Sequence, residues 1–76
     1  MLNNDQRHLA RDIVDVIRDA YPDADCRWWN VIPENAMLFV ETAPGEDEQL
    51  ITFDLTDDSV TFRDLAERTL DRLRVR

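Results

Sequence analysis

The sequence predicts an α+β domain with the order α-β-β-β-α, in which a three-stranded antiparallel meander carries both helices packed on one face. Three observations predict this fold. Apolar residues recur at helical spacing near both ends of the chain. Between them lie three short segments rich in β-branched and aromatic residues, and the connections between these segments are short enough for hairpins. The 76 residues are sufficient for a single domain, 1–76.

The first helix is expected over residues 4–20. Asn3 or Asn4 is placed to cap its start, and Gln6 would complete a capping box from Asn3. Pro22 ends the helix, because the residue before a proline is pushed out of the α region. The apolar stripe that would face the core consists of Leu9, Ile13, Val16, Ile17 and Ala20.

Three strands are expected over residues 26–32, 36–42 and 49–55. Pro33-Glu34-Asn35 favours a turn between the first two strands. Ala43-Pro44-Gly45-Glu46 is typical of a type II turn, since the only glycine of the chain falls at the position that needs a positive φ. Both connections are short, so neighbouring strands should pair antiparallel.

A second helix is expected over residues 62–75, and its start carries the clearest local signature in the chain. Thr61 is placed as the N-cap, and Asp64 can complete a capping box. Val60 and Leu65 are spaced as a hydrophobic staple. The stripe that we expect to be buried consists of Phe62, Leu65, Ala66, Thr69, Leu70 and Leu73.

Alternation along the strands allows the two faces of the sheet to be compared. In the third strand, the residues that belong under the helices are Ile51, Phe53 and Leu55. The second strand offers two apolar pairs, Leu38 with Val40 and Met37 with Phe39. Trp28 and Trp29 are adjacent in the first strand, so they must point to opposite faces. One tryptophan and one large apolar pair therefore lie on the face without helices.

An apolar patch on the helix-free face indicates an interface, because such patches are uncommon on soluble monomers. The candidate interface residues are Trp28, Trp29, Met37, Phe39 and Leu50. A symmetric homodimer with sheet against sheet is the simplest arrangement. The alternative is that loops or the ends of the chain fold across this face.

The charge balance is strongly acidic, with 17 acidic and 9 basic residues and a net charge of −8. Every basic residue is arginine, and twelve of the acids are aspartate. A salt-loaded cytoplasm favours short carboxylates and screens their repulsion, whereas GC-rich codon usage favours arginine over lysine. Codon usage should also raise the glycine content, yet Gly45 is the only glycine, so we favour a halophilic source.

The sequence contains few candidates for catalytic or metal-binding residues. His8 lies in a helix without a partner implied by spacing, and Cys26 at the start of a strand is best explained as a packed residue. The run Asp54-Leu55-Thr56-Asp57-Asp58-Ser59 has alternating oxygen ligands but lacks the central glycine and the final glutamate of a calcium loop. We therefore expect no catalytic residues, no metal and no cofactor, and the protein is not expected to be an enzyme.

The sequence also bears on location. No apolar run approaches the roughly 20 residues needed to cross a bilayer, and the start of the chain lacks the features of a signal peptide. A single cysteine fits a reducing compartment. We therefore expect a cytoplasmic protein without membrane association.

The order α-β-β-β-α at this length resembles that of the double-stranded RNA-binding domain. That family carries a basic cluster at the start of its second helix and a basic loop between strands. The corresponding stretch here, Thr61-Phe62-Arg63-Asp64-Leu65, has one arginine and one aspartate, and the hairpin tip Glu46-Asp47-Glu48 is acidic. The resemblance is one of topology, and a shared layout does not carry function.

The leading functional hypothesis is a small non-enzymatic interaction domain that binds itself or another protein through the helix-free face. Nucleic acid is not expected as a partner, because a chain with a net charge of −8 is repelled by phosphate backbones. The alternative is a nucleic-acid-linked protein, either a degenerate module similar to the double-stranded RNA-binding domain or an acidic DNA-mimic inhibitor. In that case phosphate or an acidic partner would contact Arg68, Arg72 and Arg76.

Overall fold

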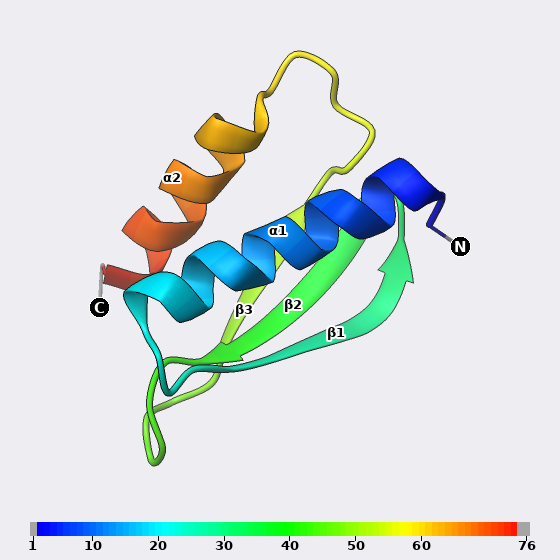
Figure 1. The fold of residues 1–76 in the computed structure, drawn as a ribbon. Helices are drawn as coiled ribbons and strands as arrows, with labels where there is room; N and C mark the ends of the chain where they lie inside the picture. Colours follow the sequence, from blue (N-terminus) through cyan, green and yellow to red (C-terminus); the bar gives the residue numbers. More distant parts are fainter. Residues whose placement is uncertain (1, 75–76) are drawn as a thin grey trace.

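The computed structural model describes residues 2–74, apart from the side chain of Asn30. Its elements follow the order α1 (Asn4–Ala20), β1 (Asp25–Ile32), β2 (Asn35–Glu41), β3 (Gln49–Phe53) and α2 (Phe62–Arg74). The strands form one antiparallel sheet in the order β1-β2-β3. Both helices lie on the same face of this sheet (Figure 1). The predicted α+β class and its helix–three-strand–helix order are confirmed.

Helix α1 begins with a complete capping box. The Asn3 side chain accepts the backbone N–H of Gln6 at 2.8 Å, and the Gln6 side chain accepts the backbone N–H of Asn3 at 3.0 Å. Two backbone donors that the first turn leaves without helical partners are satisfied in this way. Ile13 and Ile17 are fully buried beneath the helix, whereas Ala20, which we predicted in the buried stripe, is exposed.

The connection between β2 and β3 turns at Gly45, whose φ is +87°. The N–H of Glu46 donates to the carbonyl of Ala43 at 3.0 Å, as expected for the predicted type II turn. Strand β3 ends at Phe53, two residues earlier than expected, because the carboxylate of Asp54 accepts the backbone N–H of Thr56 at 2.9 Å and turns the chain.

Helix α2 starts with the second predicted capping box. The N–H of Asp64 donates to the Thr61 hydroxyl at 3.2 Å, and the N–H of Thr61 donates to the Asp64 carboxylate at 3.4 Å. Thr69 and Leu73 are buried, and the Thr69 hydroxyl donates to the carbonyl of Leu65 at 2.7 Å. Phe62 departs from the predicted buried stripe: it lies in the first turn of α2, where 39% of its surface stays exposed.

The core lies between the sheet and the two helices. Leu38 and Val40 of β2 are fully buried there, so this pair, rather than Met37 with Phe39, points towards the helices. On β1, Trp28 points the same way and packs its ring against Phe53, with centroids 5.6 Å apart. The remaining core side chains are Ile13, Ile17, Ala24, Ala36, Ile51, Leu55 and Leu73.

Strand β1 contains a β-bulge that the sequence did not indicate. Trp29 is opposite Met37 and Ile32 is opposite Asn35, so two residues of β1 lie opposite the single residue Ala36. Such an insertion reverses the alternation of the bulged strand beyond it. Ile32 therefore shares the face of Trp29.

Candidate interaction site

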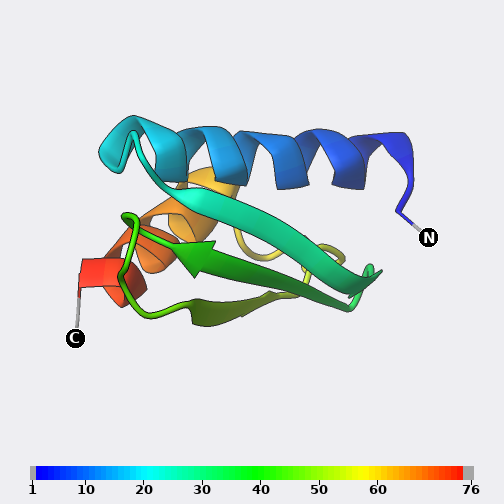
Figure 2. The ribbon, with the colours of Figure 1, turned by 90° about the horizontal axis from the view of Figure 1, so that it is seen from below.

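The helix-free side of the sheet carries a continuous set of apolar side chains, which we call the open face: Trp29, Ile32, Met37, Phe39 and Leu50. Figure 2 shows both helices on one side of the sheet and no described helix on the other. Strand pairing brings these residues together, since Phe39 lies between Arg27 of β1 and Leu50 of β3, and Met37 lies beside Trp29. Such cross-strand neighbours are about 4.5–5.5 Å apart.

The most exposed large apolar side chain of the open face is that of Trp29, at 59%. Its ring lies 5.9 Å from that of Phe39 with an interplanar angle of 54°, a tilted arrangement that aromatic pairs favour. Ile32 and Leu50 add exposed fractions of 43% and 39% on either side of this pair. Exposed apolar residues are common individually, but a contiguous group centred on a tryptophan is typical of a binding surface.

An ion pair borders the open face. Arg27 Nη2 donates to Glu48 Oε2 at 2.6 Å, which links β1 to the residue preceding β3. This hydrogen bond and the charge of Glu48 raise the pKa of the Arg27 guanidinium. Together with Trp28, Trp29 and Phe39, the pair lines a shallow pocket of about 320 Å³. Exposed ion pairs contribute little to stability, so its main effect is to place one charge of each sign beside the aromatic pair.

The structure divides the predicted interface residues between two faces. Trp29, Met37, Phe39 and Leu50 lie together on the open face, whereas Trp28 points towards the helices. Alternation alone leaves open which of the two tryptophans faces outward, and the structure places Trp29 there. Ile32 was missed, because its position depends on the bulge, for which the sequence gives no signal.

A second hollow, which the sequence did not indicate, lies between α1 and β1. This α1–β1 groove has a volume of about 410 Å³ and a predominantly apolar lining. Its lining includes Ala10, Val14, Cys26, Trp28 and Val31, and the side chains of Arg7 and Arg11 border it. The groove lies on the face of β1 opposite to Trp29, because Trp28 and Trp29 alternate.

Cys26 is half-buried in the α1–β1 groove, and burial raises the pKa of its thiol above that of an ordinary cysteine. The positive charge of Arg18 lowers this pKa, and the negative charge of Asp25 raises it further. At any pH below this pKa the reactive thiolate is therefore scarcer than for an ordinary cysteine. Because burial disfavours the thiolate, the free energy of unfolding is highest while the thiol is protonated. This stabilisation is lost as the pH rises through the raised pKa.

Iodoacetamide should therefore alkylate Cys26 more slowly in the folded protein than in the protein unfolded in urea. The pH profile of the folded-state rate should have its midpoint at a higher pH than the profile of the unfolded protein. Mass spectrometry of samples quenched at intervals measures both rates. A folded-state midpoint at or below that of the unfolded protein would contradict the expectation.

The acidic run before α2 forms turns. The Asp57 carboxylate accepts the backbone N–H of Ser59 at 3.0 Å and its hydroxyl at 2.5 Å, and these hydrogen bonds lower the pKa of Asp57. Asp54 accepts the same two kinds of hydrogen bond from Thr56. Within residues 2–74, no group of three or more histidine, cysteine, aspartate or glutamate side chains is arranged to hold a metal ion.

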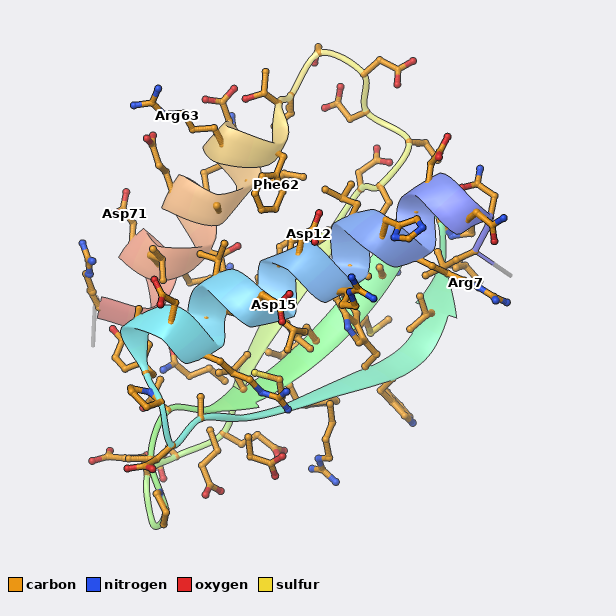
Figure 3. The ribbon with its side chains drawn as sticks, viewed as in Figure 1. Arg7, Asp12, Asp15, Phe62, Arg63 and Asp71 are labelled. Carbon is orange, nitrogen blue, oxygen red and sulfur yellow. The ribbon has the colours of Figure 1, made fainter. Side chains whose placement is uncertain are left out.

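Two of the three arginines that we predicted as phosphate contacts, Arg68 and Arg72, lie on α2. Arg68 and Arg72 are exposed, and Arg76 lies outside the described residues. Arg63, on the outer side of the same helix (Figure 3), pairs with Glu67 at 3.3 Å. Aspartates and a glutamate are interspersed among these arginines, so α2 presents mixed charge rather than a uniformly basic surface.

No family model, no curated protein and no solved structure matches this chain. The described helices include none that is both long enough and apolar enough to span a bilayer.

Proposed function

We propose that this chain is a small, non-enzymatic protein-interaction domain of the cytoplasm that forms a homodimer through the open face. The observation that carries the proposal is the 59% exposure of Trp29 within a row of apolar neighbours. Burying this patch against a second copy would remove apolar surface from water, which is the main favourable term in most protein association. Tryptophan is also among the residues that contribute most to binding at interfaces.

The charges at the border of the open face favour a second copy as the partner. Arg27 and Glu48 place one positive and one negative group beside Trp29 and Phe39. In a two-fold symmetric contact the same patch meets itself, so a residue i that touches j is matched by j touching i. Such a contact allows Arg27 of each copy to approach Glu48 of the other, so that no two groups of the same charge face each other.

The size of the patch predicts a weak dimer. Three strands about 4.8 Å apart, with five paired residues rising about 3.3 Å each, give a flat area of about 14 Å by 17 Å. Even with its rim, this falls short of the roughly 800 Å² per partner of a standard interface. The net charge of −8 on each copy adds repulsion that salt reduces. We therefore expect a reversible dimer of micromolar or weaker affinity that strengthens with salt.

Sedimentation equilibrium at protein concentrations from about 10 μM to 1 mM in about 1 M KCl tests the dimer. The average mass should rise with concentration from the 9.0 kDa of the monomer towards twice that value. Trp29→Ser should keep the protein monomeric over the same range, because it removes the central apolar side chain. Its circular dichroism spectrum should match that of the parent, since Trp29 lies outside the core.

A matched pair of variants distinguishes dimerisation through the open face from non-specific association through any exposed apolar side chain. Leu50 and Phe62 are both 39% exposed, but Leu50 lies on the open face and Phe62 lies on α2. Leu50→Ser should weaken the dimer, and Phe62→Ser should leave it unchanged. A parent protein that stays monomeric at about 1 mM, or a Phe62→Ser variant that weakens association as much as Leu50→Ser, would overturn the proposal.

A further inference from the structure

Strand β1 has an unusually available outer edge. It is eight residues long and lies at one side of the sheet order β1-β2-β3, so within residues 2–74 its outer backbone groups pair with no other strand. Proteins normally protect long edge strands from pairing with another chain, since their unpaired N–H and C=O groups are a template for a further strand. The bulge lies between Trp29 and Ile32 in the pairing with β2, and the stretch from Asp25 to Trp29 keeps a regular register.

The α1–β1 groove runs beside this edge and offers space for side chains. Its wall on α1 includes Ala10 and Val14, and its floor on β1 includes Cys26, Trp28 and Val31. A volume of about 410 Å³ falls in the range of ligand sites, which are mostly apolar with a few polar groups that fix orientation. A groove between a helix and an exposed strand edge can hold the alternate side chains of a strand added to that edge.

Two charged side chains border the groove, and both are arginines. Arg7 and Arg11 are four residues apart on α1, which separates them by about 6 Å along the helix, and both are exposed. Neither forms an ion pair within residues 2–74. Figure 3 shows Arg7 on the side of α1 that lies towards the end of β1. Two like charges at this spacing repel each other, and an anionic partner relieves the repulsion.

We propose that the α1–β1 groove binds an extended acidic segment of a partner protein, which adds to the sheet beside β1. Side chains on one face of a strand are spaced about 6.6 Å apart, which matches the separation of Arg7 and Arg11. Because α1 and β1 run in opposite directions (Figure 1), the two arginines lie towards the end of β1 and Val14 lies towards its start. The segment therefore carries carboxylates at positions i and i+2 and an apolar side chain at i+4.

The two tryptophans make this proposal testable separately from the homodimer. Trp28 lines the α1–β1 groove, and Trp29 lies on the open face. Each indole N–H gives its own signal in a ¹⁵N–¹H correlation spectrum, and the single variants Trp28→Phe and Trp29→Phe assign the two signals. A peptide in the groove should move the Trp28 signal, whereas dilution of a dimer should move the Trp29 signal.

The probe is a short fluorescein-labelled peptide in which two glutamates and a leucine alternate with serines. Titration into the protein at low salt should shift the Trp28 indole and the β1 amides and leave the Trp29 indole in place. A peptide with lysines in place of the glutamates should not bind. Movement of Trp29 alone, equal binding of the lysine peptide, or no binding at about 1 mM would overturn the proposal. So would binding of decanoate, an anionic amphiphile without a peptide backbone, if the acidic peptide does not bind.

The double variant Arg7→Glu with Arg11→Glu should weaken peptide binding at least about tenfold, because it replaces two charge-assisted contacts with repulsion. Arg68→Glu with Arg72→Glu is the matched control, since these exposed arginines have the same spacing on α2. Both double variants change the net charge from −8 to −12. An equal loss of peptide affinity in the two variants would show that only net charge matters and would overturn the proposed binding site. Circular dichroism verifies that each variant is folded.

Discussion

Leu38→Ala is expected to lower the free energy of unfolding by about 3 kcal/mol, since Leu→Ala changes in cores cost about 2.7–5 kcal/mol. Leu38 is fully buried on the central strand, opposite Trp28 on one side and Ile51 on the other. Truncation removes buried apolar surface and leaves a cavity that neighbours on both flanking strands can fill only in part. A domain of 76 residues has a total stability of about 4–11 kcal/mol, so the variant loses a large share of it.

Leu50→Ala provides the control for Leu38→Ala. It is the same chemical change on the neighbouring strand, but Leu50 faces away from the helices and is 39% exposed. Its cost should stay below about 1 kcal/mol. Urea denaturation followed by circular dichroism, at a concentration low enough to keep the protein monomeric, measures both. Similar losses in the two variants would contradict the assignment of the faces.

Raising KCl from about 10 mM to 1 M is expected to increase the thermal midpoint by about 4–16 °C. The chain carries a net charge of −8, and acidic side chains such as Asp15 and Asp71 lie on the outer surfaces of the helices (Figure 3). The ion pairs Arg27–Glu48 and Arg63–Glu67 are both exposed. Folding brings the acidic side chains closer together, which raises their mutual repulsion. Salt that reduces this repulsion by about 1–2 kcal/mol would produce a shift of this size.

The shape of the salt response identifies its cause. The screening length falls from about 30 Å at 0.01 M to about 8 Å at 0.15 M and then changes little in absolute terms. Screening therefore predicts that most of the rise occurs below about 0.15 M, whereas salting-out of apolar surface grows steadily into the molar range. Differential scanning calorimetry across this series measures the curve. A midpoint indifferent to salt would favour codon usage over a halophilic source as the explanation of the charge composition.

The features that could be predicted from the sequence are those that depend on residues close together in the chain. Both capping boxes, Asn3 with Gln6 and Thr61 with Asp64, join residues three apart, so the local chain contains all the atoms involved. The turn at Gly45 likewise depends on one residue that tolerates a positive φ. Because these local signals mark where each element starts and stops, the order of helices and strands could be predicted.

The candidate sites depended on contacts between distant segments, so the sequence could specify them only in part. Alternation required Trp28 and Trp29 to separate, but both faces of the second strand were apolar, and only packing against the helices decided that Leu38 and Val40 are buried. The bulge that moves Ile32 to the open face arises from pairing with β2. The α1–β1 groove exists only because α1 lies beside β1, since that packing brings Arg7 and Arg11 to a strand edge far from them in sequence.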